Sequence, residues 1–208
     1  FRRRTILHHL LDQEYSWLRI MLLALGLRLT LLGLLADDPL VGDSLQYQLV
    51  AEKLVHQGEI DTYWPPGMPL YLSGIMKVFG ESTIWLRLAM LPWFIWLCHR
   101  FYALTYRLHS RPAANLGLLL LAVFPAMIHQ SVEPLSYLPA AALLLALFDL
   151  MQRYLDRRRR GQLLRMGICL GLLILFRPSA MLFLFGLPAL ILIRRKKFLP
   201  GLTLTVVT

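Results

Sequence analysis

The chain has 208 residues, of which 57% are hydrophobic. This apolar share is higher than that of soluble globular domains, so the composition excludes an ordinary soluble enzyme and indicates an integral membrane protein. The formal net charge is +10, but the basic residues gather at the ends of apolar runs, which is typical of membrane topology and argues against a nucleic-acid partner.

Apolar segments recur along the whole chain, and several approach the length that a membrane-spanning helix requires. We expect about six membrane helices. The predicted fold is an all-α, polytopic transmembrane helix bundle that forms a single domain over residues 1–208. Because the chain begins at Phe1 and ends in an apolar stretch, we expect it to be a fragment. The predicted helices cover residues 17–36, 84–106, 113–128, 135–151, 163–176 and 179–193.

The distribution of Lys and Arg predicts the orientation. Basic clusters lie before the first predicted helix and after the second, fourth and sixth: "FRRR", Arg107 with Arg111, "RYLDRRRRGQLLR" and "RRKK". By the positive-inside rule, these clusters face the cytoplasm. We therefore expect a multi-pass plasma-membrane protein whose N-terminus is cytoplasmic and whose first loop, residues 37–82, faces outward.

The first outer loop has a helical pattern of its own. Asp43 is followed three residues later by Gln46, which predicts a side-chain cap at a helix N-terminus. Apolar residues then recur at helical spacing until Gly58, so we expect an amphipathic helix in the membrane interface that ends at this glycine. The next stretch, "WPPGMP", predicts a rigid extended turn, and a second short helix follows at residues 70–79.

Charged residues near a bilayer are candidate functional residues, because they are costly to place there. Asp43 is either a general base for an incoming hydroxyl or only a helix cap. Glu133 precedes Pro134, the predicted first residue of the fourth helix, so it is either a first-turn charge or a second acidic residue facing Asp43. Arg177 lies at an outer turn, where it binds a phosphate headgroup or extends to lipid phosphates.

Other charged residues have mainly structural interpretations. Arg28 lies deep in the first helix and is expected to pair inside the bundle, while the role of Arg87 is left open. Asp149 is expected to pair with a nearby arginine such as Arg153, four residues later on the same helix. The two cysteines and the isolated histidines match no zinc pattern.

An ordered series of motifs resembles the GT-C superfamily of membrane glycosyltransferases. The similarity is to the branch that contains protein O-mannosyltransferases and the aminoarabinose transferase of lipid A, and it extends over nearly the whole chain. One departure is Ser44, because some relatives carry a second acidic residue at this position. This departure weakens the inference of a metal bound by adjacent carboxylates, so a divalent metal is possible but is not supported by the sequence. The motifs are "GDSLQY", "AEKLVHQG", "YWPPGMPLYL", "WLRLAMLP", "LLLLAVFPAMIHQSVEPLSYLPAAALLLALF" and "GLLILFRPSAMLFL".

The resemblance implies transfer of a sugar from a polyprenyl-phosphate donor at the outer membrane face, with inversion at the anomeric carbon. Asp43 would deprotonate the acceptor hydroxyl, and Glu133 would orient the acceptor or the sugar. Arg177 and Arg87 would neutralise the departing phosphate. The acceptor would be a glycan, a lipid or a protein.

Aromatic residues complete the implied site. Tyr47 would contact substrate, and Tyr63 or Trp64 would form an apolar wall for the sugar or the lipid. The alternative is a non-catalytic lipid-handling transporter or membrane assembly subunit. A transporter more typically places its charges near the membrane midplane, whereas the charges here lie near one face, which favours the enzyme.

Overall fold

The computed structural model describes residues 16–59, 61, 63–157 and 159–195. Within these residues the chain is helical and contains no strand, which confirms the predicted all-α class. Two of the predicted basic clusters, at residues 2–4 and 194–197, lie wholly or partly outside the described residues. The helices are α2 (Ser16–Leu34), α3 (Asp43–His56), α4 (Gly67–Phe79), α5 (Thr83–Leu88), α6 (Met90–Leu108), α7 (Arg111–Val123), α8 (Pro125–Gln130), α9 (Tyr137–Arg157), α10 (Arg160–Phe176), the 3₁₀ helix η1 (Pro178–Leu182) and α11 (Phe183–Arg195).

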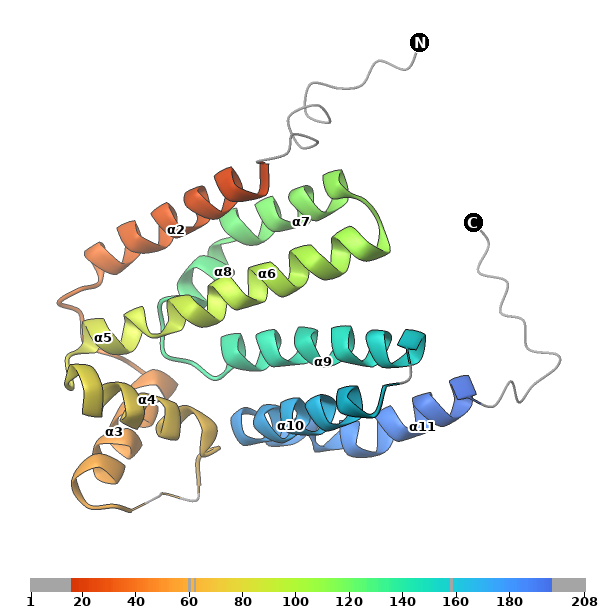
Figure 1. The fold of residues 1–208 in the computed structure, drawn as a ribbon. Helices are drawn as coiled ribbons and strands as arrows, with labels where there is room; N and C mark the ends of the chain where they lie inside the picture. The colour runs from red at the N-terminus through yellow and green to blue at the C-terminus, as the bar shows by residue number, and fades with distance from the viewer. Residues whose placement is uncertain (1–15, 60, 62, 158, 196–208) are drawn as a thin grey trace, which may run out of the picture.

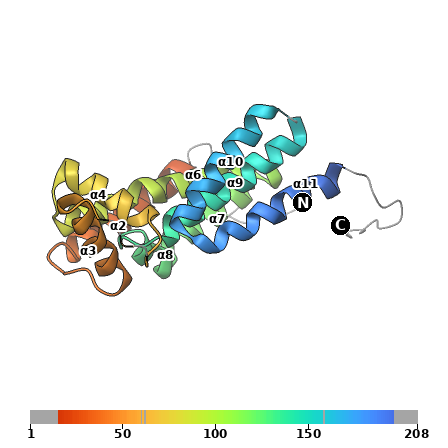
Figure 2. The same ribbon diagram turned by 90° about the horizontal axis from the view of Figure 1, so that it is seen from below.

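The long helices lie side by side, and the loop helices pack at one end of them (Figure 1). Across the bundle the packing order is α2, α7, α6, α9 and α10, and η1 joins α10 to α11. Helices α3 and α4 pack against each other, and α4 also contacts α10. Figure 2 shows α3 and α4 at the same end of the molecule from a second direction. The part of the chain predicted as the first loop therefore forms a helical layer over one end of the bundle.

Two of the predicted membrane helices are interrupted by proline. The predicted helix at 84–106 is divided at Ala89, because Pro92 has no N–H to donate to the carbonyl of Leu88. The predicted helix at 113–128 is divided at Phe124, which is extended (φ −68°, ψ 118°). A residue that precedes proline is biased away from the α conformation, and Pro125 follows Phe124 directly. The prediction of continuous helices was therefore wrong at both places.

Arg28 lies in the packed interior, as predicted, but it pairs with carbonyl groups and an aromatic ring. Its Nη1 donates to Ala122 O (2.9 Å) and its Nη2 to Leu121 O (3.2 Å), while its guanidinium carbon lies 3.6 Å from the ring centroid of Phe94. The Leu121 carbonyl would bond the N–H of residue 125 in a continuous helix, but Pro125 has none. Arg28 on α2 therefore satisfies an acceptor that the break between α7 and α8 leaves free.

Two helices in the described part of the chain are long and apolar enough to cross a membrane, namely residues 16–34 and 137–156. Two further apolar helices are shorter, at residues 111–123 and 178–190.

The fourth predicted helix begins two residues later than expected, and the fifth begins earlier than expected, at Arg160. The sixth starts as the 3₁₀ helix η1 and continues as α11. The number of membrane crossings and their orientation stay predictions.

The two helices of the first loop are close to those expected. Helix α3 ends at His56, and Gly58 adopts a positive φ of 73°, which confirms the predicted stop at this glycine. The extended turn predicted for "WPPGMP" was wrong, because Pro66 is in the α region (φ −71°, ψ −17°) and α4 begins at Gly67. Pro69 lies in the first turn of α4, where its missing N–H would have had no partner within the helix.

At Gly67 the backbone of α4 lies directly against the end of α10. A Cβ atom added there would lie 2.7 Å from the carbonyl carbon of Leu175 and 2.8 Å from the backbone nitrogen of Phe176. These contacts are with backbone, which cannot turn aside as a flexible side chain can. The absence of a side chain at Gly67 therefore allows α4 to pack on the end of α10.

We expect Gly67→Ala to lower the thermal stability of the purified protein, by about 1–3 kcal/mol, because the added methyl group forces the two helices apart. Gly74→Ala is the matched control in the same helix, since nothing lies within 4 Å of its added Cβ. The control should be neutral or stabilise by up to about 1 kcal/mol. Melting temperatures of both variants in detergent test this, and equal effects of the two substitutions would contradict it.

Candidate functional site at the loop end of the bundle

Glu133 is the centre of a buried polar cluster at the end of the bundle covered by α3 and α4. It lies in the connection between α8 and α9 and is 6% exposed. Its Oε1 lies 3.2 Å from Nη2 of Arg87 on α5. Its Oε2 accepts a hydrogen bond from the Ser44 hydroxyl on α3 at 3.1 Å. Both carboxylate oxygens are therefore held, each by a different segment of the chain.

Arg87 is more deeply buried than Glu133, with 1% of its surface exposed. Its Nη2 also lies 3.4 Å from the carbonyl oxygen of Asp38, just after α2. Its Nε and Nη1 have no hydrogen-bond partner among the described residues. A buried donor without a partner costs about 1–3 kcal/mol, so Arg87 retains hydrogen-bonding capacity that a ligand or an ordered water can use.

Tyr47 connects α3 to the start of α9. Its hydroxyl lies 3.3 Å from the hydroxyl oxygen of Ser136, and its ring meets Trp64 edge-on at a centroid distance of 5.3 Å. Trp64 in turn contacts Tyr63 at 5.4 Å, and Tyr63 is 82% exposed. Trp64 and Tyr63, the residues predicted as a wall, therefore continue a row of rings that begins at the buried Tyr47.

Tyr71 connects α4 to the break between α5 and α6. Its hydroxyl donates to the carbonyl oxygen of Ala89 at 2.5 Å, and its ring packs edge-on against Trp93 at 5.7 Å. Burial raises the pKa of the Tyr71 phenol, so the hydroxyl stays protonated and remains a donor to Ala89. This contact helps to keep α4 against the bundle beside the Glu133 cluster.

Arg177 lies between α10 and η1, at the same end of the bundle. Its backbone is extended (φ −147°, ψ 94°), because Pro178 follows it and disfavours the helical conformation. Its guanidinium carbon lies 4.4 Å from the ring centroid of Tyr137, the first residue of α9. Arg177 and Tyr137 also line a cavity of about 320 Å³ whose other walls are mainly apolar, formed by Ala140, Ala141, Leu144, Leu173, Ser179, Ala180 and Phe183.

Asp43 is exposed and is the first residue of α3. The predicted capping role was wrong, because the helix begins one residue earlier than the pattern implied. Gly42, with φ 60°, occupies the N-cap position and offers no side chain. The side chain of Asp43 makes no hydrogen bond or ion pair with any other described residue. Its neighbour Ser44 connects this turn of α3 to Glu133 instead.

The predicted start of the fourth membrane helix was also wrong. Pro134 is not its first residue, because α9 begins at Tyr137 and residues 131–136 form a non-helical connection. Glu133 is therefore not a first-turn charge. This connection carries Glu133 to Arg87 and Ser136 to Tyr47, two contacts that the sequence did not predict.

Several residues of the cluster were not recognised from the sequence. Ser44 was noted only as a departure from an acidic motif, and Ser136 and Tyr137 were not noted at all.

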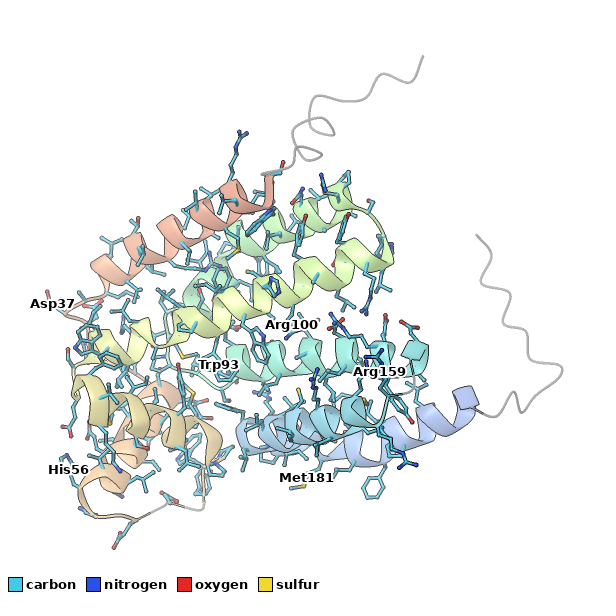
Figure 3. All side chains as sticks on the ribbon, in the orientation of Figure 1. Asp37, His56, Trp93, Arg100, Arg159 and Met181 are labelled. Atoms are coloured by element: carbon cyan, nitrogen blue, oxygen red, sulfur yellow. The ribbon has the colours of Figure 1, made fainter. Side chains whose placement is uncertain are left out.

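Within the described residues, no group of three or more His, Cys, Asp or Glu side chains gathers in a way that could hold a metal ion. His56 pairs with Glu81 at 2.5 Å on the exposed surface of this end. Figure 3 labels Asp37 and His56 on the same side of the molecule as α3 and α4.

The described residues form an all-α bundle with two helices long and apolar enough to cross a membrane, and the family comparison supports a GT-C membrane glycosyltransferase. The family model of the dolichyl-phosphate-mannose-protein mannosyltransferases matches residues 64–208. The chain belongs to this family and is a glycosyltransferase of the mannosyltransferase type. No match to this chain was found among curated proteins or among solved structures. The family match includes Arg87, Glu133 and Arg177, whereas Asp43 and α3 lie before it.

We expect Glu133→Leu to destabilise the protein by about 3–5 kcal/mol, because it leaves the charge of Arg87 buried without its partner. The double variant Arg87→Met with Glu133→Leu removes both charges and should recover much of this loss. Melting temperatures of the two single variants and the double variant, measured in the same detergent, test the coupling. Additive losses in the double variant would contradict a buried ion pair.

Proposed function

We propose that the chain transfers mannose or a related sugar from a polyprenyl-phosphate donor to an acceptor hydroxyl at the outer membrane face. The observation that supports it most directly is the Arg87–Glu133–Ser44 cluster, which fixes the first turn of α3 and thereby the residue next to Ser44, Asp43. The family description names a protein as the acceptor, so a protein hydroxyl is the acceptor that we propose. The outward orientation of this end follows from the positive-inside rule.

Asp43 is the proposed general base. It is exposed, its side chain has no partner among the described residues, and it lies in the first turn of α3. The carboxylate takes the proton of the acceptor hydroxyl while that oxygen forms a bond to the anomeric carbon. The bond from the anomeric carbon to the phosphate oxygen breaks, and the electron pair leaves with the lipid phosphate. Attack opposite the leaving group inverts the configuration.

Arg177 is the proposed partner of the departing phosphate. It is half-buried beside Tyr137 and is not engaged with a carboxylate in the described part of the chain. Arginine is suited to this role because it presents paired N–H donors to phosphate oxygens. The mainly apolar cavity that it lines gives the first isoprene units of a lipid donor an adjacent place to pack.

Glu133 is proposed as a positioning residue. Its two oxygens contact Arg87 and Ser44, so the carboxylate holds these two side chains in place. Arg87 has two unpartnered nitrogen groups, which support an additional contact with the donor phosphate or with ordered water. The row of Tyr47, Trp64 and Tyr63 supplies apolar ring faces beside α3, against which a sugar or an isoprenoid can pack.

We expect Asp43→Asn to reduce transfer by about 10²- to 10⁴-fold, since the amide cannot accept the hydroxyl proton. Its melting temperature should not change, because Asp43 makes no capping bond. Asp37→Asn is the matched control, as Asp37 is another exposed aspartate of this loop. The assay is mannose transfer from polyprenyl-phosphate mannose to a peptide hydroxyl by the full-length enzyme. Full activity of folded Asp43→Asn would exclude the proposed base.

We expect Arg177→Gln to lower kcat by about 10²- to 10³-fold, because the phosphate loses stabilisation as its charge develops. Arg111→Gln is a suitable control, since Arg111 also lies over a tyrosine ring, at 5.9 Å from that of Tyr106, but outside this site. Steady-state kinetics with the same donor measure both. An Arg177→Gln variant with unchanged kcat would assign Arg177 to lipid contact alone. An absence of transferase activity in the unsubstituted protein would favour the alternative of a lipid-handling transporter.

A further inference from the structure

A second cavity lies between α6, α9 and α10, and its charged lining residues lie toward the ends of these helices away from α3 and α4. It has a volume of about 550 Å³, and its lining combines arginines with apolar side chains. Figure 3 labels Arg100 and Arg159, two of the residues that line this cavity. Its charged lining residues are Arg100, Arg153, Arg159, Arg165 and Asp149.

One carboxylate serves three arginines beside this cavity. Asp149, whose side chain is 4% exposed, lies 2.9 Å from Nε of Arg153, as predicted for this pair. Nη2 of Arg107 lies 3.0 Å from Asp149 and Nη1 of Arg100 lies 3.5 Å from it. A single negative charge cannot balance three positive charges, so this cluster carries excess positive charge in a site partly removed from water.

Two further arginines add to this excess. Arg159 and Arg165 line the same cavity, and neither forms an ion pair with a carboxylate in the described residues. Nε of Arg100 is buried and has no hydrogen-bond partner there. The cavity therefore combines positive charge, unpaired donors and available space, which is the chemistry that recognises a phosphate group.

The rest of the lining indicates what carries the phosphate. Apolar side chains from all three helices form much of the remaining lining, namely Trp96, Leu143, Ala146, Leu150, Ile168 and Leu172. A soluble phosphate compound would leave this surface unused, whereas a lipid would place its acyl chain there. Basic pockets between membrane helices bind the headgroups of anionic lipids by this combination of contacts.

We propose that this cavity binds the phosphate group of an anionic phospholipid, with an acyl chain along its apolar wall. The site is separate from the Glu133 cluster and from Arg177, and it does not depend on the proposed catalytic reaction. The lipid phosphate adds negative charge beside five arginines that have one carboxylate among them, and it joins α6, α9 and α10 at the end opposite α3 and α4.

The proposal is tested with the full-length protein in a neutral detergent. The melting temperature is followed during titration with phosphatidylglycerol, with phosphatidylcholine and with glycerol 3-phosphate at equal phosphate concentrations. We expect saturable stabilisation by phosphatidylglycerol and much weaker effects of the other two. Equal stabilisation by phosphatidylcholine would overturn the preference for an anionic lipid, and equal stabilisation by glycerol 3-phosphate would overturn the role of the acyl chain.

Matched variants locate the site. Arg165→Gln should raise the apparent Kd for phosphatidylglycerol about fivefold, the effect of one basic side chain at a lipid headgroup. Arg160→Gln makes the same change of charge on the same helix at an exposed residue that does not line the cavity, and it should leave the Kd unchanged. The double variant Arg159→Gln with Arg165→Gln should lose more affinity than either single variant. Equal losses from Arg165→Gln and Arg160→Gln would assign the binding to general surface charge and overturn the proposal.

Discussion

The ion pair between Arg87 and Glu133 determines how the loop end of this bundle is assembled. It joins α5 to the connection before α9, and through Ser44 it also holds the first turn of α3. Both side chains are almost completely buried, so each has given up its hydration and depends on the other. Segments far apart in the sequence therefore meet at one carboxylate, and the position of Asp43 at the start of α3 depends on that contact.

The helical content and the general course of the loop were predictable from the sequence because they depend on local patterns. Apolar runs predicted the bundle, the spacing of apolar residues predicted α3, and Gly58 predicted its end. Local charge spacing also predicted the pair of Asp149 and Arg153. The interruptions at Pro92 and Pro125 could have been predicted, since each proline removes an N–H from the helix. They were missed because the apolar pattern continues through both of them.

The site was less predictable, because its contacts join residues that are distant in sequence. Glu133 and Arg177 were singled out from the cost of charge near a membrane, yet their partners were not identifiable from that argument. The capping pattern at Asp43 was misread by one residue, because the pattern does not distinguish Gly42 from Asp43 as the start of the helix. Ser44 attracted attention only as a missing acid, although its hydroxyl is the group that reaches Glu133.

The contact of Arg28 with the end of α7 has a consequence for the order of biogenesis. Arg28 and its acceptor Ala122 are 94 residues apart in the chain. During synthesis from the N-terminus, α2 therefore emerges well before the carbonyl groups that accept from its arginine. Before α7 is synthesised, only one of the three carbonyl groups that accept from Arg28 is present, that of Ala24 on the same helix. The hydrogen bonds from Arg28 to Leu121 and Ala122 can therefore form only after the end of α7 has been synthesised, so α2 completes its contacts within the bundle after a much later segment has joined it.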